Sequence, residues 1–116
     1  MNIRVLLSVL FLGIGCMDAQ AGYYDGNKLV SSMREWDKAN RNDAGANYME
    51  ATTFTAYAVG VLDTLEGSSI CPPMTSSISQ IGAVVAQYLN ANPARWSEPA
   101  HRLVKDALKK AFPCRK

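Results

Sequence analysis

The sequence predicts a small all-α domain of four helices, or of four helices and one extra short helix, held by one disulfide bond. Apolar residues recur every three or four positions in four segments of the chain, which is the spacing of one helix face. Polar breaks rich in Asn, Gly, Ser and Pro separate these segments. No segment shows a convincing alternation of polar and apolar residues, so no strand is predicted.

The first two predicted helices run over 27–39 and 48–65. Asp25 or Asn27 can cap the first helix by accepting hydrogen bonds from free backbone N–H groups. The second helix is apolar on nearly every side in its latter half, which is typical of a helix at the centre of a core. Gly60 lies in that half. Because glycine costs up to about 1 kcal/mol relative to alanine in a helix, we expect another helix to approach closely there.

The third and fourth predicted helices run over 76–90 and 98–112. Thr75 or Ser76 can cap the third helix, and Ser97 can cap the fourth. Gly82 and Ala83 in the third helix are small positions suited to tight packing. The residues expected to pack inward are Ile78, Ile81, Val85 and Tyr88 or Leu89 in the third helix, and Ala100, Leu103, Val104, Ala107, Leu108 and Ala111 in the fourth.

The first 21 residues have the three parts of a cleavable secretory signal peptide. Arg4 supplies the positive start, residues 5–16 form an apolar run, and Ala19-Gln20-Ala21 is a small-x-small cleavage site. The apolar run has about 12 residues, whereas a membrane-spanning helix needs roughly 20. We therefore expect residues 22–116 to form one exported domain that has no membrane contact after cleavage.

The three cysteines divide into one in the signal peptide and two in the exported domain. Cys16 leaves with the signal peptide. A lipid-attached Cys16 is the alternative, although Gly13-Ile14-Gly15 before it lacks the leucine usual at such a site. An oxidising compartment would join Cys71 to Cys114, closing a loop of about 44 residues worth roughly 4 kcal/mol. The chain has no Cys-x-x-Cys motif, which counts against a metal-binding or reactive thiol pair.

Residues with catalytic chemistry are few and scattered. His101 is the single histidine, and the local sequence offers only Glu98 to orient it for acid–base work, so a surface or packing role is favoured. The chain has no Gly-x-Ser-x-Gly, Ser-x-x-Lys or His-Glu-x-x-His motif and no phosphate-binding glycine loop. We predict a binding protein rather than an enzyme, with no metal and no cofactor.

Charge is unevenly distributed along the chain, whose formal net charge is +2. Acidic residues outnumber basic ones over 22–94, and basic residues outnumber acidic ones over 95–116. A basic end of this kind can favour an acidic partner or nucleic acid, but a solvated helix face is the simpler interpretation. Export argues further against nucleic acid.

Two places are candidates for a partner-binding surface. Loop 66–70 is small and polar and is anchored beside Cys71, so it can enter a partner's cleft, with an inert connection as the alternative. Arg and Trp are frequent anchors of protein interfaces, and an Arg-Trp pair lies between the last two helices, where the Trp can also act as a lid over the core. The predicted partner-binding residues are Glu66, Gly67, Ser68, Ser69, Ile70, Arg95 and Trp96.

Five short motifs follow one another over almost the whole chain after residue 21. They are Gly26-Asn27-x-Leu29, Tyr57-x-x-Gly60-Val61-x-Asp63, Cys71-Pro72-Pro73, Gln80-x-x-x-Val84-Val85-x-x-Tyr88-Leu89-x-x-x-Pro93 and Ala100-x-x-Leu103-Val104-x-x-Ala107-Leu108-x-x-x-Phe112-Pro113-Cys114. In the order and spacing of these motifs the chain resembles the Rap/Tai immunity proteins, which act against type VI secretion amidases of Gram-negative bacteria.

The resemblance implies a small helical domain in the periplasm, commonly a homodimer. It also implies that the protein binds a peptidoglycan-cleaving amidase delivered by a neighbouring cell and blocks its active-site cleft. Members of this group often carry a further cysteine early in the first helix and another near the start of the second. Here the corresponding stretches are Ser31-Ser32-Met33 and Thr53-Phe54-Thr55, so we expect the first helix to be less firmly tied.

Two other classes of protein remain as alternatives. A small, single-disulfide periplasmic chaperone of the acid-response type would expose apolar surface at low pH, but the sequence has no obvious acid-sensing cluster. An exported enzyme would need polar residues that converge in a cleft, and a single sequence cannot show such convergence.

Overall fold

The computed structural model describes residues 23–115, and the predicted signal peptide, its cleavage site and Cys16 lie outside that range. The described residues form isolated β-bridges but no strand. They form four α-helices and one short 3-10 helix, in the order α1 (Gly26–Asn40), α2 (Tyr48–Leu65), α3 (Ile78–Ala91), η1 (Pro93–Arg95) and α4 (Ala100–Ala111). The predicted all-α fold is therefore confirmed, including the extra short helix.

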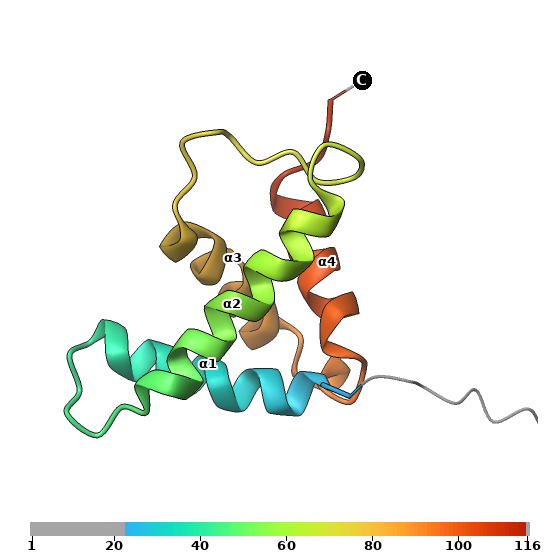
Figure 1. Cartoon of the computed structure of the whole chain (residues 1–116). Helices are drawn as coiled ribbons and strands as arrows, with labels where there is room; N and C mark the ends of the chain where they lie inside the picture. Colours follow the sequence, from blue (N-terminus) through green and yellow to red (C-terminus); the bar gives the residue numbers. More distant parts are fainter. Residues whose placement is uncertain (1–22, 116) are drawn as a thin grey trace, which may run out of the picture.

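The central helix of the fold is α2, as predicted. In Figure 1, α1 lies along the bottom, α2 rises across the front, α3 lies behind it and α4 stands to its right. Contacts join α2 to each of the other three helices. Phe54 and Ala58 on its inner face are fully buried, and Leu62 is 8% exposed. Tyr57, Val61 and Leu65 in the apolar second half are partly exposed and pack against the edge of this core.

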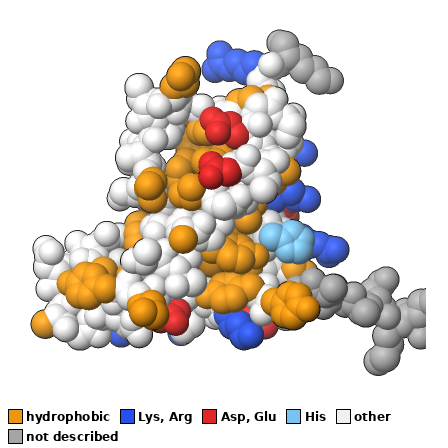
Figure 2. Space-filling view, viewed as in Figure 1, with side chains coloured by type: hydrophobic (Ala, Val, Ile, Leu, Met, Phe, Trp, Pro, Cys, Tyr) orange, Lys and Arg blue, Asp and Glu red, His pale blue; other side chains and the backbone are white. Residues whose placement is uncertain are grey.

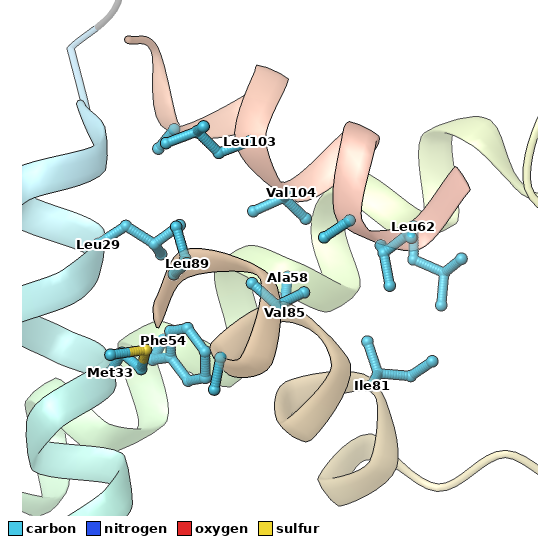
Figure 3. Close-up of a cluster of buried hydrophobic side chains, with 14 of the residues drawn as sticks. Leu29, Met33, Phe54, Ala58, Leu62, Ile81, Val85, Leu89, Leu103 and Val104 are labelled. Carbon is cyan, nitrogen blue, oxygen red and sulfur yellow. The ribbon is translucent and has the colours of Figure 1, made fainter. Parts of the chain in front are cut away.

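One apolar core receives side chains from all four helices. A fully buried Leu, Val or Phe side chain contributes roughly 1.5–3 kcal/mol relative to leaving it exposed. Ile78 and Ala111, which we expected to pack inward, are exposed terminal residues of their helices. Ala83, expected to lie in tight packing, is exposed as well. Figure 3 shows the side chains that meet in the core, which include Leu29, Met33, Phe54, Ala58, Leu62, Ile81, Val85, Leu89, Leu103 and Val104.

The two helical glycines have different surroundings. A Cβ atom on Gly82 would lie 3.2 Å from the Trp36 ring of α1, which confirms that this position is a close approach. A Cβ atom on Gly60 would meet nothing within 4 Å, so the expectation of a neighbouring helix there is wrong. Gly60 is exposed and lies on the outward side of α2.

The helix caps agree with the predictions only in part. Asp25 caps α1 as predicted, because its carboxylate accepts a hydrogen bond in the first turn. Ser77 caps α3 in a capping box, so the expected cap at Thr75 or Ser76 is wrong by one or two residues. The predicted cap at Ser97 is also wrong, since α4 has no side-chain cap and begins later than expected.

Backbone contacts with the start of α1 replace that missing cap. Gly26 N–H donates to the carbonyl of Glu98, and Ala100 N–H donates to the carbonyl of Tyr24, both at 2.9 Å. A Cβ atom on Gly26 would lie 2.5 Å from Cδ1 of Leu103, so only glycine fits at this crossing. The start of α4 is therefore set by a segment far away in the sequence.

A buried serine ties α1 to α2. Ser32 Oγ donates to Glu50 Oε2 at 2.7 Å, and the Tyr24 hydroxyl lies 2.7 Å from Ser32 Oγ. A serine hydroxyl has one proton, so Tyr24 is the donor in the second bond. The Tyr24 ring also stacks on Tyr57, with 5.1 Å between ring centroids. The first helix is thus tied by hydrogen bonds in the region where the resemblance places a second disulfide.

The predicted disulfide bond between Cys71 and Cys114 is present, with an S–S distance of 1.99 Å. It joins the segment after α2 to the segment after α4, near the top of Figure 1. Cys71 N–H donates to the carbonyl of Phe112 at 2.8 Å, and Ile70 pairs with Pro113 as an isolated bridge. The end of the described chain is therefore held against the end of α2.

Replacing Ser32 with alanine should lower the free energy of unfolding by about 1–3 kcal/mol, because Glu50 loses a donor and Tyr24 an acceptor. Urea unfolding followed by circular dichroism measures the change. Ser31→Ala is the matched control, since Ser31 is exposed on the same helix and its replacement raises helix propensity by the same amount as Ser32→Ala. That control should change stability by less than about 0.5 kcal/mol. An equal loss of unfolding free energy in both variants would contradict a stabilising role for the hydrogen bonds of Ser32.

Replacing Cys71 and Cys114 together with serine should lower the free energy of unfolding by about 2–4 kcal/mol. The bond constrains the unfolded chain over a sequence separation of 43 residues. Urea unfolding of this variant should match that of the wild-type protein kept in reductant. An unchanged urea midpoint would show that the bond adds no stability.

Candidate functional site

Loop 66–70, the first predicted partner-binding segment, is a tight turn directly after α2. Its two ends pair as an isolated bridge, and Gly67 has a φ of +77°, a conformation that side-chain-bearing residues rarely adopt. The amides of Ser68 and Ser69 both donate to the last carbonyl of α2. Backbone hydrogen bonds therefore hold the loop in one shape.

The predicted binding residues of this loop differ in exposure. Glu66, Gly67 and Ser68 are exposed, and Ser69 is half-buried. Ile70 is fully buried and belongs to the core. It therefore anchors the loop from below, and the surface offered to a partner consists of the other four residues.

The half-buried side chain of Arg95 forms hydrogen bonds with other residues of the fold. Its Nε and Nη2 atoms donate to the two carboxylate oxygens of Glu98 at 2.8 and 2.7 Å, and Nη2 also donates to Asp106 at 2.8 Å. Nη1 donates to the Tyr88 hydroxyl. One guanidinium group thus joins α3, the connection and α4. These hydrogen bonds from Arg95 lower the pKa of Glu98 from its ordinary value.

Trp96 covers the core, which agrees with the lid interpretation. Its ring is half-buried and packs against the core cluster. The indole Nε1 donates to the carbonyl of Leu89 at 2.9 Å, so the polar edge of the ring is satisfied inside the fold. The Arg34 guanidinium lies over the ring, 5.8 Å from its centroid. Trp96 and Arg95 therefore both hold the connection between α3 and α4.

A hollow of about 320 Å³ lies between loop 66–70 and the end of α4. The sequence alone favours a solvated helix face for the basic residues over 95–116, and it does not reveal that Lys109 and Arg115 among them flank this hollow. The excess of basic residues near Cys114 was the signal that could have revealed it. We call this feature the C-terminal hollow, and its lining residues are Ser68, Ser69, Lys109, Pro113, Cys114 and Arg115.

A second hollow, of about 270 Å³, lies where the end of α1 meets the starts of α2 and α3. Tyr48 and Ile78 at its rim are 63% and 61% exposed, and neighbouring Met49 is 79% exposed. Figure 2 shows hydrophobic side chains over the middle and lower part of α2, with acidic side chains toward its upper end. The two ends of α2 therefore offer surfaces of different character.

Metal-binding and membrane-spanning features are absent from residues 23–115. No three His, Cys, Asp or Glu side chains in that range lie close enough together to hold a metal ion. None of the helices described has the length and apolar character needed to cross a bilayer. His101 is exposed on the first turn of α4.

The fold and these surfaces define a small helical domain with a stiff, exposed loop at one end. The sequence pattern of the Rap1a immunity proteins matches residues 18–114 of this chain. The chain therefore belongs to the Rap1a immunity protein family, which confirms the resemblance found in its motifs. Membership indicates an immunity protein directed against a secreted effector, and proteins of this kind are typically not enzymes. No curated protein matches the chain.

The ion pairs of Arg95 with Glu98 and Asp106 predict a loss of stability in acid. Because the pKa of Glu98 is lowered in the folded protein, its stabilising effect is complete above the ordinary value of 4.5 and is lost as the pH falls through the lowered pKa. Glu98→Gln should therefore lower the urea midpoint at neutral pH and reduce its further fall in acid. The control is Asp63→Asn, which removes one exposed carboxylate that forms no ion pair with Arg95. Identical midpoints for Glu98→Gln and wild type at neutral pH would contradict the role.

Proposed function

We propose that residues 22–116 form a periplasmic immunity protein that binds a peptidoglycan amidase delivered by a type VI secretion system. It blocks the active-site cleft of the amidase by steric occlusion and catalyses no reaction itself. The match to the Rap1a immunity proteins over residues 18–114 carries the proposal. The signal-like first 21 residues support export to the compartment where such an amidase would meet its substrate.

The shape of loop 66–70 supports occlusion. The loop is held by its own backbone bonds, by buried Ile70 below it and by the disulfide bond beside it. A segment already fixed in one shape loses little conformational entropy when it enters a cleft. Small, exposed Gly67 and Ser68 at its tip suit a narrow cleft.

We also propose that the protein is a homodimer that pairs through the starts of α2 and α3. Tyr48, Met49 and Ile78 are exposed there, and the first and last of them flank the same hollow. Clustered exposed apolar side chains mark interaction surfaces. A second copy related by a two-fold axis would cover them, and loop 66–70 would remain free because it lies at the other end of α2.

Mixing residues 22–116 with the purified amidase encoded beside this gene should abolish peptidoglycan hydrolysis at an equimolar ratio. Light scattering after gel filtration gives the mass of the free protein and of the complex, and two copies are expected in each. Ser68→Arg should weaken inhibition by placing a long charged chain at the loop tip. Ser31→Arg, on the exposed face of α1, is the matched control and should inhibit normally.

Failure to bind any amidase encoded nearby would overturn the proposed function. A protein that leaves the amidase active and suppresses client aggregation in acid would instead favour the chaperone alternative. A free protein with the mass of one chain, together with full inhibition, would overturn only the homodimer.

A further inference from the structure

The C-terminal hollow brings two cations and two hydroxyl groups together from separate parts of the chain. Ser68 and Ser69 come from loop 66–70, Lys109 comes from the last turn of α4, and Arg115 follows the disulfide bond. The bond between Cys71 and Cys114 holds these segments side by side. Pro113 and Cys114 form an apolar wall. The volume of about 320 Å³ lies at the lower end of the range for ligand sites.

Hydrogen-bond donors in this hollow remain available. Lys109 and Arg115 are exposed, and neither takes part in an ion pair among residues 23–115. Ser69 Oγ makes no hydrogen bond within the same range, whereas Ser68 Oγ donates to the end of α2. Arg95, by contrast, is already paired with two carboxylates. No lining residue of the hollow is acidic.

We propose that the C-terminal hollow binds a carboxylate side chain of a protein partner. A guanidinium group can hold a carboxylate by two parallel hydrogen bonds, with an ammonium group and a hydroxyl completing the set. The inference rests on the proposed function, because the partner it names is the effector. An acidic residue at the rim of the effector's cleft would dock here while loop 66–70 enters the cleft.

The surrounding charges favour one acidic side chain over an extended anionic surface. Glu66 is exposed at the start of the same loop, and Asp63 is exposed one turn earlier on α2. Figure 2 shows acidic groups near the upper end of α2, while basic groups follow the edge where α4 lies. A membrane or another polyanion would meet the acidic groups and be repelled, whereas a single carboxylate can reach the hollow alone.

Charge reversal of the hollow should weaken effector binding. The double variant Lys109→Glu/Arg115→Glu should bind the effector at least about tenfold more weakly and lose much of the salt dependence of association. Lys28→Glu/Arg102→Glu changes the net charge equally at exposed sites near the starts of α1 and α4, and it should bind within about threefold of wild type. Equal urea midpoints of the two variants would show that both are folded.

A direct probe works without the effector. In an NMR titration, a short acetylated peptide containing one glutamate should shift the amide signals of Ser69 and Arg115 more than those of the starts of α1 and α4. The matching glutamine peptide should not shift them. Amide signal shifts of equal size all along α4 would overturn the inference. Stronger binding of inorganic phosphate than of the glutamate peptide would also overturn it.

The two proposals can fail separately. If wild type and both double variants bind the effector equally well, the carboxylate site is wrong and the proposed function stands. If wild type binds no effector, the proposed function fails, and the peptide titration alone decides whether the hollow binds a carboxylate.

Discussion

The packing of α2 against the other three helices is the interaction on which the remaining structure depends. Phe54 and Ala58 on this helix are fully buried and lie where side chains of α1, α3 and α4 converge (Figure 3). The helix has 18 residues and is therefore about 27 Å long. That length separates the exposed apolar side chains at its start from loop 66–70 at its end, so the two surfaces proposed to bind partners lie at opposite ends of the helix.

A domain of this size has a modest core and gains from additional ties between its elements. Three bonds of different chemistry join its helices. The Ser32–Glu50 hydrogen bond joins α1 to α2, the disulfide bond joins the ends of α2 and α4, and Arg95 joins α3 to α4. The disulfide has a second consequence, because it brings the cations of the C-terminal hollow beside the loop proposed to enter the effector.

Local signals in the sequence were sufficient for most of the fold. The bounds of α2 agree with the prediction at both ends, since Asn47 caps its first turn and Gly67 follows its last. The expectation for Gly60 failed because the second half of α2 is apolar all round, so periodicity does not reveal which side faces inward. The predicted start of α4 was wrong for a different reason, since this start depends on backbone hydrogen bonds to the segment where α1 begins.

The candidate site was less predictable because its residues meet only in three dimensions. Loop 66–70 was recognised from its composition, but its cationic neighbours Lys109 and Arg115 lie far along the chain. The contacts of Arg95 inside the fold could not be predicted, because two of its partners, Tyr88 and Asp106, belong to different helices. A single sequence contains no record of such pairings, whereas the pair of cysteines could be assigned because no other partner remained.

Hydrogen–deuterium exchange of the free and effector-bound protein tests the central claim most directly, namely that a pre-formed loop at the end of α2 blocks the effector. The account predicts slow exchange in α2 in both states and added protection on binding in loop 66–70 and the segment that follows α4. Protection confined to α1, or an unchanged loop in a complex that inhibits the amidase, would contradict it.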